Sequence, residues 1–450
     1  MSARAGKAKA RRRSVPTEYN LLLTATLCLL ALGAVMVFSA SSTTRILQDG
    51  GLSDSAYYLQ RTVIIGAAGL VLMHVAARVG LGAVRRLTPL FLVGTLALLL
   101  VVPVAGTTVN GATRWLGSGL FQVQPAELAK VALILYAADA LAGNPRRARS
   151  LQGMRPLLVV AAASCGLIML QPDMGTTMVI ALAVGATLVA AGARPRDLGL
   201  IALALGFLAL VMTVIEPYRM ARLTGFLNPG ADLEGSGFQV AQAKIALGSG
   251  GLFGVGIGDG VQKAFYLPEA HTDMISAVIG EELGLIGILA VVGLFGMLGY
   301  AGLRIAQRAR DAYGKLLAAG LTSLILIQAT INLFAVMGLA PLTGVPLPFV
   351  SYGNNSLLAC LFAVGLILNV ARGGRATAAR GTGEGRRGGR SAGRSRAAGA
   401  GKLRVVEGGL SPATQRKRSN GARNAKSRGG GGRNRRARRA RAGGRRPAAG

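Results

Sequence analysis

Histidine and cysteine are scarce in this sequence of 450 residues. The two histidines, His74 and His271, are too few for a metal site built from several histidine ligands. The three cysteines, Cys28, Cys165 and Cys360, stand singly in apolar runs, so their spacing indicates neither a metal site nor a disulfide framework. We therefore expect the cysteines to serve as packing residues.

Several motifs of soluble enzymes are also absent. The glycine-rich run Gly248–Gly260 does not match GxGxxG, and the sequence contains no GxxxxGK(S/T) and no HExxH. Nucleotide-driven transport and zinc hydrolysis are therefore disfavoured, and no nucleotide cofactor is expected.

Acidic residues are few, with 18 Asp and Glu against 51 Lys and Arg. The positive excess lies at the two ends: residues 1–13 hold six basic residues and no acid, and residues 372–450 hold 24 basic residues and two acids. The tail contains no aromatic residue, so we expect it to be disordered. We expect anionic cytoplasmic lipid to hold it, and we expect no specific nucleic-acid binding without stacking residues.

Apolar residues make up 51% of the chain and gather in long runs. Ten runs are long enough to cross about 30 Å of hydrocarbon. They cover residues 20–40, 62–77, 87–106, 126–142, 157–171, 174–192, 198–216, 273–303, 316–338 and 355–371. The fold class predicted is an all-α polytopic membrane protein with a long extracytoplasmic loop between helices 7 and 8. It divides into a basic N-terminus (1–19), a membrane domain (20–371) and the tail (372–450).

The distribution of positive charge sets the orientation. With the N-terminus in the cytoplasm, every cytoplasmic connection carries Arg or Lys, as the positive-inside rule requires. Four connections besides the short first loop then face outward: Thr107–Pro125, Gln171–Met174, Pro217–Thr272 and Leu339–Asn354. The third is too long for a mere link, and Gln239–Leu247 within it resembles a short amphipathic or re-entrant helix.

The stretch Gly237–Gly287 is the strongest candidate site. Seven glycines between Gly248 and Gly260 let the backbone turn sharply, and the stretch delivers Asp273, Glu281 and Glu282 to a spanning helix. A charge within a spanning helix costs roughly 2.5–3.5 kcal/mol, so its retention suggests a function. Asp273 has helix capping as its alternative role, and we expect the two glutamates to pair with buried Arg or Lys.

Two further outward segments carry charge. In NGATRWL, Arg114 beside Trp115 is either an interfacial anchor or a phosphate-binding arginine next to an aromatic surface. In QPAELAK, Glu127 and Lys130 share a helix face and form either a structural ion pair or a cationic group for an anionic substrate. In QPDMGTT, Asp173 has helix capping as its alternative role.

These blocks, together with PLTGVPLPFVSYG, resemble the SEDS family (shape, elongation, division and sporulation), membrane glycosyltransferases that polymerise peptidoglycan. They cover most of residues 20–371 in the family's order, and GVGIGDGVQKAFYLPEAHTD followed by IGEELG is more like the division branch than the elongation branch. One departure is SYGNNS, which includes Asn354 and Asn355, where the family has SYGG(S/T)S.

The resemblance implies that the chain polymerises lipid II into β-1,4-linked glycan and releases undecaprenyl pyrophosphate, with Asp273 as the general base. Candidate substrate-binding residues are Arg114, Trp115, Glu127, Lys130, Asp173, His271, Glu281, Ser351 and Tyr352. A divalent cation, Mg or Mn, is a candidate cofactor, although no ligand cage can be read from the sequence. The implied partners are a class B penicillin-binding transpeptidase and divisome proteins at the septum of the bacterial cytoplasmic membrane. The alternatives are an elongation-type polymerase, a lipid II flippase and a non-catalytic division scaffold.

Overall fold

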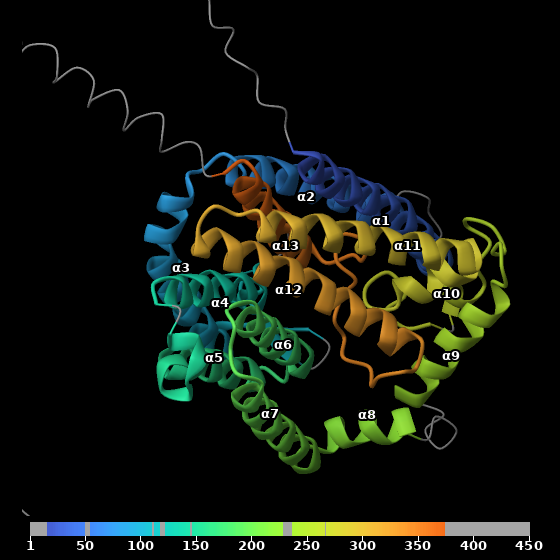
Figure 1. The fold of residues 1–450 in the computed structure, drawn as a ribbon. Helices are drawn as coiled ribbons and strands as arrows, with labels where there is room; N and C mark the ends of the chain where they lie inside the picture. The colour runs from blue at the N-terminus through green and yellow to red at the C-terminus, as the bar shows by residue number, and fades with distance from the viewer. Residues whose placement is uncertain are drawn as a thin grey trace, which may run out of the picture. The chain divides into compact units, whose positions relative to one another are not determined.

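The computed structural model describes residues 16–49, 55–109, 112–117, 122–144, 146–227, 236–265 and 267–373 (Figure 1). The basic residues 1–13 and the tail from residue 374 lie outside the described residues, as do Asn110 and Gly111. The predicted disorder of the tail therefore stays a prediction.

All ten predicted spans are helices. They are α1 (Thr17–Asp49), α2 (Ser55–Ala76), α3 (Leu81–Ala105), α4 (Pro125–Ala142), α5 (Leu151–Met169), α6 (Met174–Ala190), α7 (Pro195–Ile215), α11 (Ile275–Gln307), α12 (Ala312–Val336) and α13 (Asn354–Ala371). Eight of the described helices are long and apolar enough to cross a membrane. Of the other two spans, α6 is shorter, and α4 carries Glu127, Lys130 and Asp139. The predicted fold class is confirmed.

Shorter elements fill the connections. Between α7 and α11 lie α8 (Pro217–Leu227), α9 (Ser236–Ser249) and α10 (Gln262–Phe265), and the predicted helix Gln239–Leu247 falls within α9. A 3-10 turn, η2 (Arg147–Arg149), precedes α5. After α3 the chain forms an antiparallel hairpin of β1 (Thr107–Val109) and β2 (Ala112–Trp115), which was not predicted.

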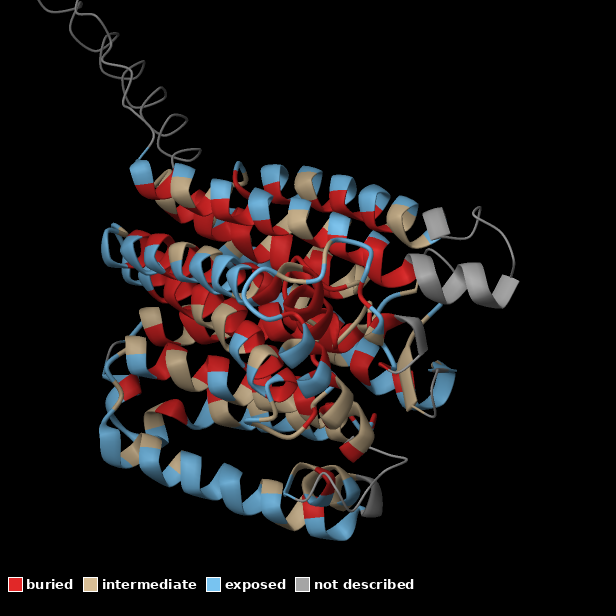
Figure 2. Ribbon diagram, turned by 90° about the vertical axis from the view of Figure 1, so that its right-hand side faces the viewer, coloured by how far each residue is buried: buried red, intermediate tan, exposed pale blue. Residues whose placement is uncertain are grey.

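Helix α12 is the centre of the bundle. It packs against α4, α6, α11 and α13 (Figure 1). In its most apolar stretch 72% of the residues are buried, whereas in that of α7 only 6% are. Figure 2 shows this contrast, with the exposed α7 at the bottom. Gln328 and Asn332, two polar side chains of α12, are therefore enclosed by protein.

Helix α11 is broken at Gly284, and the glycine-rich loop fills the break. Gly284 has φ 66° and ψ −161°, which removes helical hydrogen bonds around it. The loop replaces them: Val255 N donates to Glu281 O at 3.0 Å, and Leu285 N donates to Gly251 O at 3.0 Å. Backbone groups within hydrocarbon need such partners. The loop thereby fixes the first turns of α11, and with them the loop that carries Asp273.

Candidate functional site

Asp273 lies two residues before α11 and is half-buried. The predicted alternative, capping of α11, is not seen, because the N-cap residue is Met274 and makes no side-chain cap. The Asp273 carboxylate instead accepts a hydrogen bond from Thr272 Oγ1 at 3.3 Å. Asp273 is therefore not committed to holding the helix end.

The surroundings of Asp273 raise its pKa above the value of an ordinary aspartate. Burial raises the pKa of Asp273 to about 6, and the negative charge of Glu269 contributes in the same direction. The positive charge of Arg222 opposes the shift. Thr272 Oγ1 lies 2.9 Å from Glu269 Oε2 and 3.3 Å from Asp273 Oδ1, so the two carboxylates share its single proton. A carboxylate with a pKa near the working pH is suited to accept and release a proton.

Asn332 on α12 holds the main chain of Asp273. Its Nδ2 donates to Asp273 O and to Val345 O, both at 2.8 Å, while its Oδ1 accepts from Ser276 Oγ at 2.9 Å. One buried amide therefore ties together the loop before α11, the first turn of α11 and the loop before α13.

Gln328, one turn earlier on α12, makes the same kind of link deeper in the bundle. It accepts from Lys130 Nζ at 2.9 Å and donates to Pro346 O and Ser356 Oγ, both at 3.0 Å. Lys130 Nζ also donates to Glu127 Oε1 at 2.8 Å, and both charged side chains are buried. The structural ion pair is thus present, and Lys130 is joined through Gln328 to the same loop that contacts Asn332.

Three arginines line a cavity of about 200 Å³ at this end of the bundle. Arg114 comes from β2, and Arg219 and Arg222 come from α8. Met174, Met178, Leu223, Ala340, Pro341 and Leu342 supply an apolar wall. The cavity extends to Gly344, where a Cβ would lie 3.9 Å from Asp273 Oδ2. It therefore combines positive charge with apolar surface beside Asp273.

Main-chain carbonyls hold these guanidinium groups in place. Arg114 donates to Gln171 O and Pro172 O at 3.1 and 2.6 Å, Arg219 to Met212 O at 3.1 Å, and Arg222 to Leu342 O at 2.8 Å. Arg219 and Arg222 were not singled out from the sequence. Their i, i+3 spacing in an outward loop, where the positive-inside rule disfavours arginine, was an available signal.

An aromatic cluster includes His271, two residues before Asp273. Tyr58 of α2 lies with its ring centroid 4.8 Å from that of His271 and 5.0 Å from that of Tyr352. Tyr352 N donates to His271 O at 2.9 Å, which joins the loop before α13 to the loop before α11. Burial raises the pKa of Tyr352, so its phenol stays a hydrogen-bond donor at neutral pH.

Other predicted site residues have structural contacts. Asp173 caps α6, accepting from Thr176 N at 3.0 Å. Ser351 Oγ accepts from Leu347 N at 2.8 Å. Trp115 is half-buried in β2. Asn355 Nδ2 donates to Gln122 O at 3.0 Å from the first turn of α13, so the SYGNNS departure ties α13 to the segment before α4.

The two glutamates of α11 differ from each other. Glu282 is buried and pairs with Lys263 Nζ at 2.6 Å, as predicted, and it accepts from Ser39 Oγ at 2.7 Å. Glu281 was expected to pair with a cation as well, but its Oε1 accepts from the main-chain N–H groups of Val261 and Gln262. Both glutamates therefore secure the segment that follows the glycine-rich loop.

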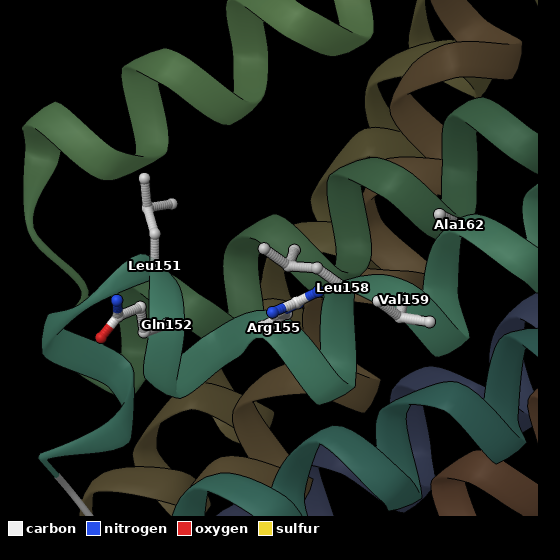
Figure 3. A pocket seen from close by; sticks show the side chains of 6 residues that line it. All are labelled: Leu151, Gln152, Arg155, Leu158, Val159 and Ala162. Carbon is white, nitrogen blue, oxygen red and sulfur yellow. The ribbon is translucent and has the colours of Figure 1, made fainter.

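Another cavity, of about 390 Å³, lies along α5 (Figure 3). Its lining consists of Leu151, Gln152, Arg155, Leu158, Val159 and Ala162. These residues occupy the half of α5 that begins at Leu151, whereas the end near Met169 leads into the turn contacted by Arg114. This cavity is therefore separate from the Asp273 site.

Known proteins resemble this chain over the residues that form the helical bundle. The family model described as cell cycle protein, covering FtsW, RodA and SpoVE, matches residues 19–376. The probable peptidoglycan glycosyltransferase FtsW of Trichlorobacter lovleyi is 43% identical over 361 residues, which cover 79% of this chain and 94% of that protein. Stage V sporulation protein E of Bacillus subtilis is 41% identical over 358 residues, which cover 78% and 96%.

A solved structure has the same fold. It is a chain from a study of how a peptidoglycan synthase complex coordinates polymerization and crosslinking. That chain superposes with a TM-score of 0.65 at 29% identity, over 78% of this chain and 96% of its own length. The likeness therefore extends over nearly the whole of the described helical bundle.

Proposed function

This chain belongs to the cell cycle protein family of FtsW, RodA and SpoVE, and we propose that it is a peptidoglycan glycosyltransferase with Asp273 at its reaction centre. The observation that carries the proposal is the position of Asp273 next to an arginine-lined cavity and two residues after His271 of the aromatic cluster. Relatives named as probable peptidoglycan glycosyltransferases support the same reaction class.

The proposed substrate is lipid II, a disaccharide-pentapeptide joined to undecaprenyl through a diphosphate. Asp273 removes the proton from the 4-hydroxyl of the acceptor GlcNAc, and that oxygen attacks the anomeric carbon of the donor. A β-1,4 bond forms with inversion as the bond from the anomeric carbon to the diphosphate breaks. The raised pKa of Asp273, about 6, leaves it ionised yet basic enough for this transfer near neutral pH.

The arginine-lined cavity is the proposed site of the leaving diphosphate. Negative charge builds up on the leaving oxygen, and fixed guanidinium groups stabilise it. Arg114, Arg219 and Arg222 supply three such groups, and the apolar wall suits the first isoprenoid units. Trp115, which follows Arg114 on β2, is proposed to help position the substrate.

A divalent cation fits the residues beside Asp273. Glu269 presents a carboxylate beside the Thr272 hydroxyl, and oxygen ligands suit Mg²⁺ or Mn²⁺. When bound, such a cation supplies positive charge for the diphosphate. No group of three or more His, Cys, Asp or Glu side chains is found among the described residues, so substrate oxygens would complete its coordination.

We place the reaction at the outer face of the bacterial cytoplasmic membrane, with both termini inside. The positive charge of the predicted cytoplasmic connections supports this orientation. A class B penicillin-binding transpeptidase is the proposed partner, since a structural relative comes from a peptidoglycan synthase complex that also crosslinks. Divisome proteins at the septum, and anionic lipid bound by the basic tail, are proposed as further partners.

Division is the proposed process. Named FtsW relatives support it at 43% and 41% identity. The sporulation protein of Bacillus subtilis is 41% identical, so identity alone does not separate the two roles. Elongation, as carried out by RodA, is the next alternative within the family.

One experiment separates the enzyme from a lipid II flippase and from a scaffold. The full chain is purified with its transpeptidase partner and supplied with lipid II and Mg²⁺ or Mn²⁺. The enzyme releases undecaprenyl diphosphate and glycan polymer, and the folded Asp273→Ala variant releases neither. A flippase instead moves lipid II across liposomes without forming polymer. A scaffold does neither, and its cellular function is lost on deleting the tail but survives Asp273→Ala.

A further inference from the structure

The aromatic cluster beside Asp273 extends to the protein surface. Tyr57, which is 46% exposed, lies edge-on to Tyr58 with ring centroids 5.5 Å apart. Arg61, one turn later on α2, donates from Nη1 to the Tyr57 hydroxyl at 3.0 Å. The first turns of α2 therefore present ring edges, a phenol and a guanidinium next to the loop that carries Asp273.

The position of the cluster relative to Asp273 is fixed by the backbone. His271 lies two residues before Asp273, in a turn where Thr272 N and Met274 N both donate to Glu269 O. The hydrogen bond from Tyr352 N to His271 O holds the second ring against this turn. A ligand on the rings would thus be held in a constant position relative to the Asp273 carboxylate.

Packing of α2 against the two loops explains only part of this arrangement. It accounts for the contacts of Tyr58 with His271 and Tyr352, at 4.8 and 5.0 Å between ring centroids. Tyr57 is exposed beyond these contacts, and the half-buried Arg61 donates to its hydroxyl at 3.0 Å. Aromatic rings that are apolar on their faces and polar at one end suit ligands with both kinds of surface.

We propose that Tyr57, Tyr58, His271 and Tyr352 form the subsite for the acceptor saccharide. A pyranose ring offers an apolar face of C–H groups that stacks on an aromatic ring, and hydroxyls that bond to phenols. Arg61 adds a positive charge for the carboxylates of a peptide attached to the sugar. This inference rests on the proposed transferase function.

The arrangement of charge assigns the acceptor, rather than the donor, to the aromatic cluster. The donor departs as a diphosphate, and two of the three cavity arginines, Arg219 and Arg222, come from α8. Helix α2 lies on the opposite side of α12 from α8 (Figure 1). A base must contact the hydroxyl that it deprotonates, so the acceptor belongs between Asp273 and the rings.

The test varies the acceptor alone. The donor is a lipid II whose own 4-hydroxyl is blocked, and the acceptor is a short-chain lipid II at increasing concentration. We expect Tyr58→Ala to raise the KM for the acceptor about threefold to tenfold, while the KM for the donor is unchanged. Tyr58→Phe keeps the ring and should stay within about twofold of wild type. Tyr300→Ala, an exposed tyrosine on the far part of α11, is the matched control.

A binding measurement makes the test independent of turnover. The probe is the lipid-free GlcNAc-MurNAc pentapeptide, and saturation-transfer NMR is recorded on the full chain in detergent. We expect saturable binding to wild type and to Asp273→Ala, and weaker binding to Tyr58→Ala. Absence of binding to wild type, or an equal acceptor KM for Tyr58→Ala and wild type, would overturn the acceptor subsite. If wild type still polymerises lipid II when the acceptor subsite is overturned, the proposed transferase function stands. If wild type makes no polymer, the transferase function is refuted.

Discussion

Asn332 on α12 donates a hydrogen bond from Nδ2 to the main-chain oxygen of Asp273 at 2.8 Å. The same Nδ2 donates to Val345 O, and Asn332 is buried. The carboxylate is thus positioned from behind by a residue that lies 59 positions later in the chain. Asn332 itself is a positioning residue and takes no proton.

Removal of this amide is predicted to slow catalysis as well as to destabilise the fold. Asn332→Ala leaves two buried carbonyls without a donor. Each unsatisfied carbonyl costs about 1–3 kcal/mol of the free energy of unfolding. Displacement of the base should lower kcat by about tenfold to a hundredfold, with the KM less affected. Asn369→Ala is the control, because it also removes a buried donor to main-chain oxygens but lies at the far end of α13. Equal kcat for the two variants would refute the positioning role.

The pH dependence of the reaction should report Asp273. Only the ionised carboxylate accepts a proton, so the rate should rise with pH through about 6 and then level off. Glu269→Gln removes a negative charge that raises this pKa, so the midpoint should move to lower pH. Asp259→Asn, an exposed carboxylate of the glycine-rich loop, should leave the midpoint unchanged. If Glu269→Gln leaves the midpoint of the pH profile unchanged, the titrating group is not Asp273.

Arg222 is predicted to have two separable effects. Arg222→Ala should weaken inhibition by undecaprenyl diphosphate about tenfold or more, because a charge-assisted contact is lost. It should also move the pH midpoint upward, since Arg222 lowers the pKa of Asp273. Arg155→Ala, in the cavity along α5, is the matched arginine control. Unchanged inhibition in Arg222→Ala would place the diphosphate elsewhere.

The break in α11 should not tolerate a side chain. Gly284 has φ 66°, and a Cβ there would collide with main-chain atoms of Leu252 and Gly254. Gly284→Ala is therefore expected to lower the free energy of unfolding by about 1–2 kcal/mol or more. That is the usual cost of a positive φ for a residue that carries a Cβ. Gly293→Ala, in the same helix with open space around its Cβ position, should be neutral or stabilising. Thermal unfolding in detergent measures both, and equal melting temperatures would contradict the constraint.

The spans and the place of Asp273 could be predicted from the sequence. Apolar runs long enough to cross a bilayer are easily recognised in a sequence, and a carboxylate at the end of such a run stands out. The hairpin of β1 and β2 was missed although Thr107, Thr108 and Val109 precede an Asn-Gly pair, a common hairpin turn. Its strands have only 3 and 4 residues, too few for a recognisable alternation of apolar and polar side chains.

The polar links inside the bundle required the structure. Gln328 and Asn332 lie four residues apart in an apolar helix, a signal that marks one polar face of α12. Their partners come from α4, α11 and the loop before α13, and no spacing along the chain brings these together. The same holds for Glu281, whose partners are main-chain groups that only the folded loop presents.

The most direct measurement is the initial rate of polymer formation by Asp273→Asn. This change keeps the shape of the side chain and removes its ability to accept a proton. We predict a loss of about 10²–10⁴-fold in rate with lipid II binding retained, while Asp259→Asn keeps the wild-type rate. A folded Asp273→Asn protein that polymerises lipid II at the rate of wild type would contradict the role of Asp273 as the base.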